Sequence, residues 1–162
     1  MKKIGSILIL FLLIFQTCLA STYSSDPKVF IQELVNDSLN KLSDKNLTKE
    51  EKVNFIETVA IENIDINALG LYTLGELRKS ADKSSLNKYQ KTFEKYFLKS
   101  LTSRLTDYSS NKFEVISAEK KSSNYTIVKS KVVQNKNQPE IKIDWRIYTK
   151  NPEKPLIRDL IV

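Results

Sequence analysis

The spacing of apolar residues changes near residue 110, and this change limits the folds open to the chain. Before it, apolar side chains recur every three or four positions, as in amphipathic helices. After it they alternate with polar ones, as in half-buried strands. Helices followed by strands with short loops predict an α+β fold, in which N-terminal helices pack on one face of a curved antiparallel sheet of about four strands.

Capping signals predict where the first two helices begin. Asp26-Pro27 combines an N-cap acid with proline at the first helical position. Thr48 and Glu51 have the spacing of a capping box, which opens a second helix. We expect this second helix to end near Asn63.

Two further helices are expected before the strands. Residues 67–80 contain Gly70 and Gly75 among leucines, which predicts a short helix with close backbone contacts. A long helix is expected from Ser84 or Ser85 to about residue 108. Its apolar side chains form a broad, largely aromatic stripe, made of Tyr89, Phe93, Tyr96, Phe97, Leu101 and Leu105.

The second half of the chain is expected to form strands at residues 113–119, 125–134, 140–150 and 156–162. The third of these, EIKIDWRIYTK, shows the alternation most clearly, with its apolar face built from Ile141, Ile143, Trp145 and Ile147. The short polar segments between the strands predict an antiparallel meander.

The first twenty residues, MKKIGSILILFLLIFQTCLA, have the pattern of a cleaved secretory signal peptide. Their apolar block is short for a bilayer span, although a retained membrane anchor is the competing interpretation. Cys18 is the only cysteine, so residues 21–162 contain no thiol and are expected to form one domain stabilised by its core. Export without disulfides indicates a bacterial periplasm or cell surface.

The charge distribution does not favour nucleic-acid binding. The chain carries a net charge of +7, and removal of Lys2 and Lys3 leaves +5. Lysines are scattered among acidic residues, and arginine occurs only at positions 78, 104, 146 and 158. Nucleic-acid sites usually gather cations on one face. Scattered lysine is typical of a solvated surface that can approach anionic membranes or acidic partners.

Composition removes most catalytic chemistries. The sequence has no histidine and no G-x-S-x-G segment. The pairs Glu62/Asp65 and Asp144/Asp159 remain as candidate carboxylates, but we interpret them as caps or ion-pair partners, with Asp144 and Asp159 pairing to Arg146 or Arg158. We therefore expect no enzymatic activity, no metal site and no cofactor.

Residue patterns alone leave two interpretations of the abundant apolar side chains open. One is an ordinary filled core, which is the common reason for an aromatic stripe on a helix. The other is a cavity for an apolar ligand.

The sequence also resembles the MlaC family of periplasmic phospholipid-binding proteins, or toluene-tolerance family, over nearly all of residues 21–162. Ile64-Asp65 stands where the family has Phe-Asp, Leu74-Gly75 matches its Leu-Gly, and IDWR at 143–146 takes the place of its V-D-Y-R. RDLIV at 158–162 matches the start of its last strand. The long-helix pattern is carried by Phe93, Phe97, Leu101, Leu105 and Tyr108.

Two departures from the family pattern stand out. Leu77 replaces a tryptophan that follows the Leu-Gly, which is an apolar exchange. The chain also ends at Val162, ahead of the Glu-Gly ending of the family, so the resemblance implies a domain that is truncated at its C-terminus.

The resemblance implies a periplasmic carrier that holds a glycerophospholipid by its acyl chains in an apolar cavity. Such a carrier shuttles lipid between an inner-membrane ABC transporter complex and an outer-membrane lipoprotein and porin complex, which maintains outer-membrane lipid asymmetry. We expect a monomer, and a non-catalytic adaptor with a filled core is the alternative. The expected lipid-binding residues are Leu71, Leu74, Phe93, Phe97 and Leu101 on the helices and Val115, Val128, Val132, Ile143, Trp145 and Ile147 on the sheet.

Overall fold

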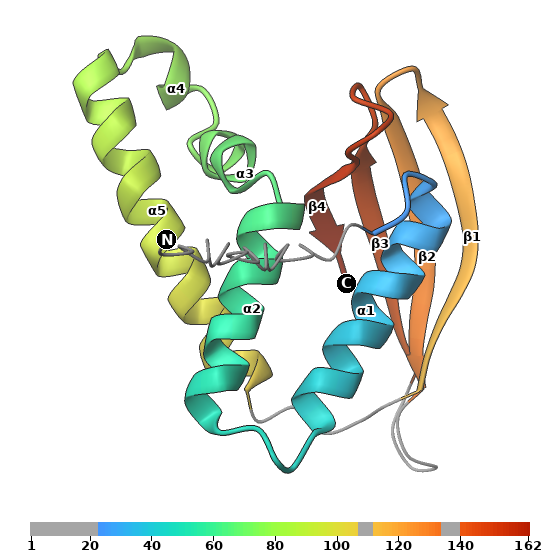
Figure 1. Ribbon diagram of the computed structural model, residues 1–162. Coiled ribbons are helices and arrows are strands. Elements are labelled where there is room, and N and C mark those ends of the chain that lie inside the picture. Colours follow the sequence, from blue (N-terminus) through green and yellow to red (C-terminus); the bar gives the residue numbers. More distant parts are fainter. Residues whose placement is uncertain (1–22, 107–111, 134–139) are drawn as a thin grey trace, which may run out of the picture.

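The computed structural model describes residues 23–106, 112–133 and 140–162 (Figure 1). The signal peptide expected at residues 1–20 lies outside these ranges. The helices are α1 (Pro27–Ser43), α2 (Lys49–Asn63), α3 (Ile66–Thr73), α4 (Leu77–Ser80) and α5 (Lys83–Leu105). The strands are β1 (Lys112–Ser122), β2 (Tyr125–Val133), β3 (Ile141–Tyr148) and β4 (Leu156–Ile161).

The helices begin at the expected capping residues. The Asp26 carboxylate accepts hydrogen bonds from the backbone N–H groups of Lys28 and Val29, both at 2.9 Å. The Thr48 and Glu51 capping box is fully formed. α5 begins slightly earlier than expected because Asp82 is its N-cap, accepting from the N–H of Ser85 at 3.0 Å.

The strands form a four-stranded antiparallel sheet in the order β1-β2-β3-β4, as the short connections predicted. β1 is longer than expected and continues to Ser122, where a tight turn leads to Tyr125. Register shifts interrupt β1 between Val115 and Ser117 and between Lys120 and Ser122. The α+β class is therefore confirmed.

The strand register divides the sheet into an inner and an outer face. Val128 lies opposite Trp145, and Thr126 lies opposite Ile147, which places these four residues on the inner face. α1 packs on this face at β1 and β2. The resulting core consists of Phe30, Ile31, Leu34, Val128, Trp145, Ile147 and Ile157.

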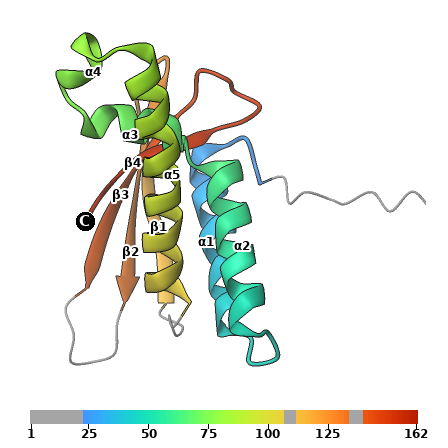
Figure 2. The ribbon, with the colours of Figure 1, turned by 90° about the vertical axis from the view of Figure 1, so that its left-hand side faces the viewer.

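The remaining helices form a second layer. α5 packs chiefly on α2 and α3, whereas α1 packs on the sheet. Figure 1 shows α5 and the sheet on opposite sides of the molecule, and Figure 2 shows α5 in front of the strands. The helices thus do not all cover the sheet directly, because α5 packs on α2 and α3, and α3 in turn packs on β4.

The structure explains why glycine occupies both positions 70 and 75. A Cβ atom on Gly70 would lie 2.9 Å from Cδ1 of Phe93, so glycine permits α3 and α5 to approach closely. This is the close backbone contact that the sequence predicted. Gly75 has a φ of +53° and ends the turn after α3, a conformation that other residues rarely adopt.

Across the described ranges, no helix combines the length and the apolar character that a membrane span requires.

Candidate functional site

The expected lipid-binding residues of the sheet share its inner face. Ser130 pairs with both Ile143 and Val115, and Val128 and Val132 lie on the same side of β2 as Ser130. Their exposure differs. Val128 and Ile147 are fully buried and Val132 and Trp145 are 9% exposed, whereas Val115 and Ile143 are partly buried.

α1 covers part of this inner face. Its buried side chains Phe30, Ile31 and Leu34 belong to the same cluster as Val128 and Ile147. The apolar face continues beyond α1 toward the edge strand β4. Leu160 lies opposite Trp145 on this side of the sheet and is 45% exposed. The inner face therefore combines a packed part with an uncovered apolar edge.

A polar contact fixes Trp145 within this face. Its indole Nε1–H donates a hydrogen bond of 2.7 Å to Oγ of Ser130, which in turn donates to the carbonyl oxygen of Ile143 at 3.2 Å. Phe113 meets the Trp145 ring edge-on, with 6.4 Å between ring centroids. These contacts hold the indole in one orientation because a buried N–H needs its partner.

The expected helical residues belong to the second layer. Leu71, Leu74, Phe93, Phe97 and Leu101 are all partly buried. The rings of Tyr89, Phe93 and Phe97 stack in succession, at 6.0 and 6.1 Å between centroids. Tyr96 was expected in the same stripe but is 69% exposed. The structure thus brings the expected residues together as two groups, one on the sheet and one on α3 and α5.

Arg158 joins α3 to the sheet through Asp65. Its Nε donates to Oδ2 of Asp65 at 2.7 Å, and its Nη1 donates to the hydroxyl of Tyr125 at 3.0 Å. Burial lowers the pKa of Arg158, but the bonds to Tyr125 and Asp65 outweigh it and raise that pKa overall. The expected pairing of Arg158 with Asp144 or Asp159 is wrong.

The backbone explains this correction. Ile64 and Ile157 form an isolated parallel bridge, and the Asp65 N–H donates to the Ile157 carbonyl oxygen at 2.9 Å. The start of α3 is therefore held beside β4, with Asp65 next to Arg158. The Asp65 carboxylate also caps α3 by accepting from the N–H of Ala68 at 3.0 Å. Of the suggested carboxylate candidates, Asp65 thus has a structural role as cap and ion-pair partner.

Arginine and tyrosine side chains stack on the outer face of the sheet. The Arg158 guanidinium carbon lies 3.4 Å from the centroid of the Tyr148 ring. That of Arg146 lies 4.5 Å from the centroid of Tyr125, and the two tyrosine rings are 5.3 Å apart. Cation–π contacts of this kind leave the N–H groups at the guanidinium edge available for other partners.

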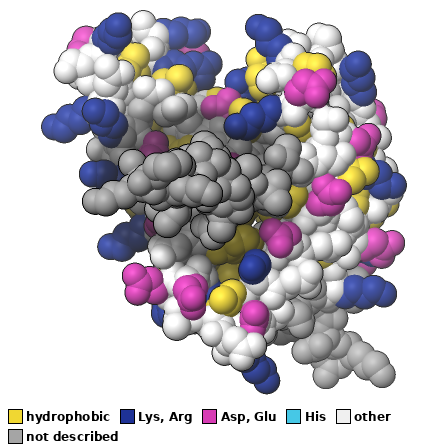
Figure 3. Space-filling model, viewed as in Figure 1, with side chains coloured by type: hydrophobic (Ala, Val, Ile, Leu, Met, Phe, Trp, Pro, Cys, Tyr) yellow, Lys and Arg dark blue, Asp and Glu magenta, His cyan; other side chains and the backbone are white. Residues whose placement is uncertain are grey.

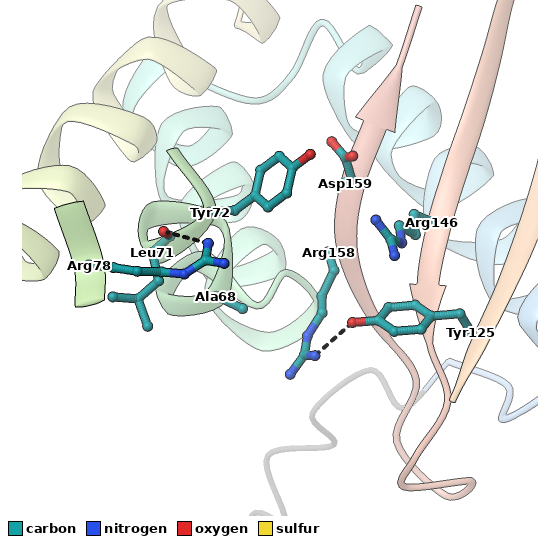
Figure 4. Close-up of a pocket in the computed structure, with 8 residues that line it drawn as sticks. All are labelled: Ala68, Leu71, Tyr72, Arg78, Tyr125, Arg146, Arg158 and Asp159. Atoms are coloured by element: carbon teal, nitrogen blue, oxygen red, sulfur yellow. Dashed lines mark hydrogen bonds between the residues drawn. The ribbon is translucent and has the colours of Figure 1, made fainter. Parts of the chain in front are cut away.

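A pocket of about 370 Å³ lies between α3, α4 and this outer face (Figure 4). Its lining residues are Ala68, Leu71, Tyr72, Arg78, Tyr125, Arg146, Arg158 and Asp159. Leu71 was expected to contact lipid tails. Sequence reasoning missed the pocket because its residues come from distant segments. The one hint in the sequence was that arginine is scarce and therefore worth locating, since three of the four arginines line this pocket.

Charge elsewhere is mixed. On the face seen in Figure 3, basic and acidic side chains are interspersed rather than gathered in one patch. Among the residues that the structure describes, no group of three or more carboxylate, cysteine or histidine side chains is arranged to hold a metal ion.

Comparison with known proteins gives a family model and a solved structure that this chain resembles. The family model described as MlaC protein matches residues 32–162. A solved structure of a phospholipid-binding protein from Ralstonia solanacearum, in complex with a phospholipid, has a similar fold with a TM-score of 0.63. The two sequences are 15% identical, and the match covers 82% of this chain and 75% of the other. No curated protein sequence matches the chain.

Proposed function

Because the chain belongs to the MlaC family, we propose that it is a periplasmic carrier that binds a glycerophospholipid by its acyl chains. The family match over residues 32–162 is the observation that carries this proposal. The Ralstonia solanacearum protein of similar fold, which was solved with a phospholipid, supports it.

Physical chemistry sets what such a carrier must do. Two acyl chains contain about thirty methylene groups, and each contributes ~0.8 kcal/mol when it is removed from water. Full exposure would therefore cost on the order of 25 kcal/mol. The carrier must cover both chains almost completely, whereas a polar headgroup can remain in water.

We place the acyl chains between the two groups of apolar residues described above. The uncovered edge of the inner face, marked by Leu160, would form one wall. The partly buried stripe of Phe93, Phe97 and Leu101 on α5 would form the other. Because α5 packs chiefly on α2 and α3, a movement of α5 would widen this space without breaking the core of α1 with β1 and β2.

Export and delivery complete the proposal. Residues 1–20 would direct secretion as a cleaved signal peptide, and residues 21–162 would form the lipid-binding domain. The carrier would then shuttle lipid, as a monomer, between an inner-membrane ABC transporter complex and an outer-membrane lipoprotein and porin complex, maintaining lipid asymmetry. It would need no catalytic group for this transfer, since the lipid is unchanged.

Mass spectrometry of an organic extract tests the binding directly. Protein purified from the bacterial periplasm should yield glycerophospholipid in a fixed molar ratio to protein. A matched purification of an unrelated periplasmic protein controls for carried-over membrane. An extract with no more lipid than this control contradicts the proposal.

A non-catalytic adaptor with a filled core is the second candidate. The observation that favours it is the close packing of Phe30, Ile31 and Leu34 on the inner face, which fills the space nearest β1 and β2. An adaptor would yield a lipid-free extract and a stable complex with a protein partner. The same extraction therefore separates the two candidates.

A further inference from the structure

Three of the four arginines in the chain converge on the pocket at the outer face of the sheet. Arg78 comes from α4, Arg146 from β3 and Arg158 from β4. Figure 4 shows their side chains around the space between α3 and the strands. In a chain whose positive charge is mostly lysine, this gathering of guanidinium groups is specific to one place.

Arg158 is held in position by the protein itself. Asp65 accepts from its Nε, Tyr125 accepts from its Nη1, and the ring of Tyr148 lies against its guanidinium carbon at 3.4 Å. Its Nη2 has no hydrogen-bond partner among the described residues. The side chain is 26% exposed, so part of it reaches the solvent. A fixed cation with free N–H groups is pre-organised for an anion.

Arg146 has no partner for its N–H groups in the part of the chain that the structure describes. Its guanidinium lies over Tyr125 and makes no hydrogen bond or ion pair with these residues. Asp159, which lies opposite Arg146 on β4, lines the same pocket but forms no ion pair with any described residue. Instead, Oδ1 of Asp159 accepts a hydrogen bond from the N–H of Leu160 at 2.8 Å. The pocket thus contains guanidinium donors that its own carboxylate does not satisfy.

The charge balance of the lining is positive. Three arginines face one aspartate, and Asp65 compensates only Arg158. Arg78 adds a cation at the rim, since it is exposed and donates only a long 3.4 Å bond to the Leu71 carbonyl oxygen. Like charges gathered in a pocket repel one another, and a bound anion relieves this repulsion.

From this geometry we propose that the pocket binds a phosphate group, which is the anion that converging guanidinium groups recognise best. Arg146 and Arg158 would donate to the phosphate oxygens, and Arg78 would close over them. Tyr72 also lines the pocket, and Figure 4 shows its hydroxyl group on the side of Asp159. The volume of about 370 Å³ lies within the range of small-molecule sites.

Two sources of phosphate share this chemistry. One is the headgroup of a phospholipid, an assignment that rests on the proposed function. The other is a soluble phosphate or phosphate ester. The pocket lies on the outer face, across the sheet from Val128 and Ile147, so a lipid whose tails lie on the inner side would have to reach it around the edge strand β4.

Calorimetric titration at low ionic strength tests the pocket. The probes are inorganic phosphate and dihexanoyl phosphatidylglycerol below its micelle concentration. Arg146→Gln and Arg78→Gln should each weaken phosphate binding at least tenfold. Arg104→Gln removes the fourth arginine, which is exposed near the end of α5, and should change the affinity by less than twofold. Thermal unfolding of each variant confirms that it is folded, and Arg78→Gln keeps the test valid if Arg146→Gln unfolds.

Each outcome decides the proposal. If phosphate and the short-chain lipid both bind and compete, the pocket is a headgroup site. If phosphate binds and the lipid does not compete, the ligand is soluble. The proposal is overturned if phosphate does not bind, or if it binds equally to wild type and to both pocket variants. Acyl-chain binding is measured separately by extraction, so a lipid-free protein that still binds phosphate would refute the carrier function alone.

Discussion

Arg158 and Asp65 lie 93 residues apart in the sequence, and their side chains form an ion pair of 2.7 Å that joins β4 to the start of α3. Both side chains are mostly buried, with exposed fractions of 26% and 19%. This pair connects the helical layer to the sheet, together with the bridge between Ile64 and Ile157. The position of α3, and with it the pocket, depends on these contacts.

Replacement of Asp65 by alanine should destabilise the protein. It removes the cap of α3 at Ala68 and leaves the guanidinium of Arg158 without its acid. We expect a loss of about 2–4 kcal/mol in the free energy of unfolding, since a cap contributes ~1 kcal/mol and a partly buried charge needs its partner. Urea unfolding measures it. Asp159→Ala, at a carboxylate without an ion pair to the described residues, is the control, and equal losses in both variants would contradict the assignment.

Gly70→Val should force Phe93 out of its place. The added side chain would meet the Phe93 ring, because Cδ1 of this ring lies only 2.9 Å from the position that a Cβ atom would take at Gly70. We expect a loss of about 1–3 kcal/mol from overpacking. Phe93→Ala in the same chain should relieve part of it, and a double-mutant cycle measures this coupling. Additive effects of the two substitutions would show that α3 and α5 do not meet here.

Ser130→Ala should leave the indole N–H of Trp145 without an acceptor. Ser130 is 1% exposed, so water cannot replace the hydroxyl, and we expect a loss of about 1–3 kcal/mol. Ser103→Ala, on the exposed side of α5, is the control and should change the stability little. Chemical unfolding followed by tryptophan fluorescence measures both. An unchanged unfolding midpoint for Ser130→Ala would mean that the hydrogen bond between Trp145 and Ser130 contributes nothing to the stability of the fold.

The capping box of α2 predicts a pH dependence. The backbone N–H and the hydroxyl of Thr48 donate to the Glu51 carboxylate, and they lower its pKa below the ordinary value of 4.5. A lowered pKa in the folded state means that this stabilisation is present above pH 4.5 and is lost as pH falls through the folded pKa. Glu51→Gln keeps an acceptor but cannot titrate. The difference in free energy of unfolding between wild type and Glu51→Gln should shrink as the pH is lowered from neutral to below the folded pKa of Glu51. A difference that stays constant with pH would refute this role of the Glu51 carboxylate.

Local features of the fold could be predicted from the sequence because they depend on neighbouring residues. Asp26 and Thr48 cap helices as expected, and the alternation around Trp145 gives the inner face of β3. The close approach at Gly70 was also predictable, although its partner Phe93 was not. Each of these features needs only a short stretch of chain.

Long-range relationships could not be predicted in the same way. The pairing of Arg158 with Asp65 depends on where α3 meets β4. The sequence of either segment alone is equally compatible with other ion-pair partners. The convergence of Arg78 and Arg146 follows from the same placement. The separation into two layers was also missed, because the stripe on α5 indicates that it packs but not on which element.

The most direct test of the carrier function compares two neighbouring residues of α5. Phe97 is partly buried in the stripe, whereas Tyr96 is 69% exposed. Phe97→Glu places a carboxylate on the proposed acyl-chain wall, and Tyr96→Glu places the same group in solvent. The measurement is the molar ratio of glycerophospholipid to folded protein in organic extracts. We predict that Phe97→Glu loses most of the lipid while Tyr96→Glu retains the wild-type ratio; equal lipid in all three proteins would contradict the placement of the chains, and its absence from wild type would contradict the function.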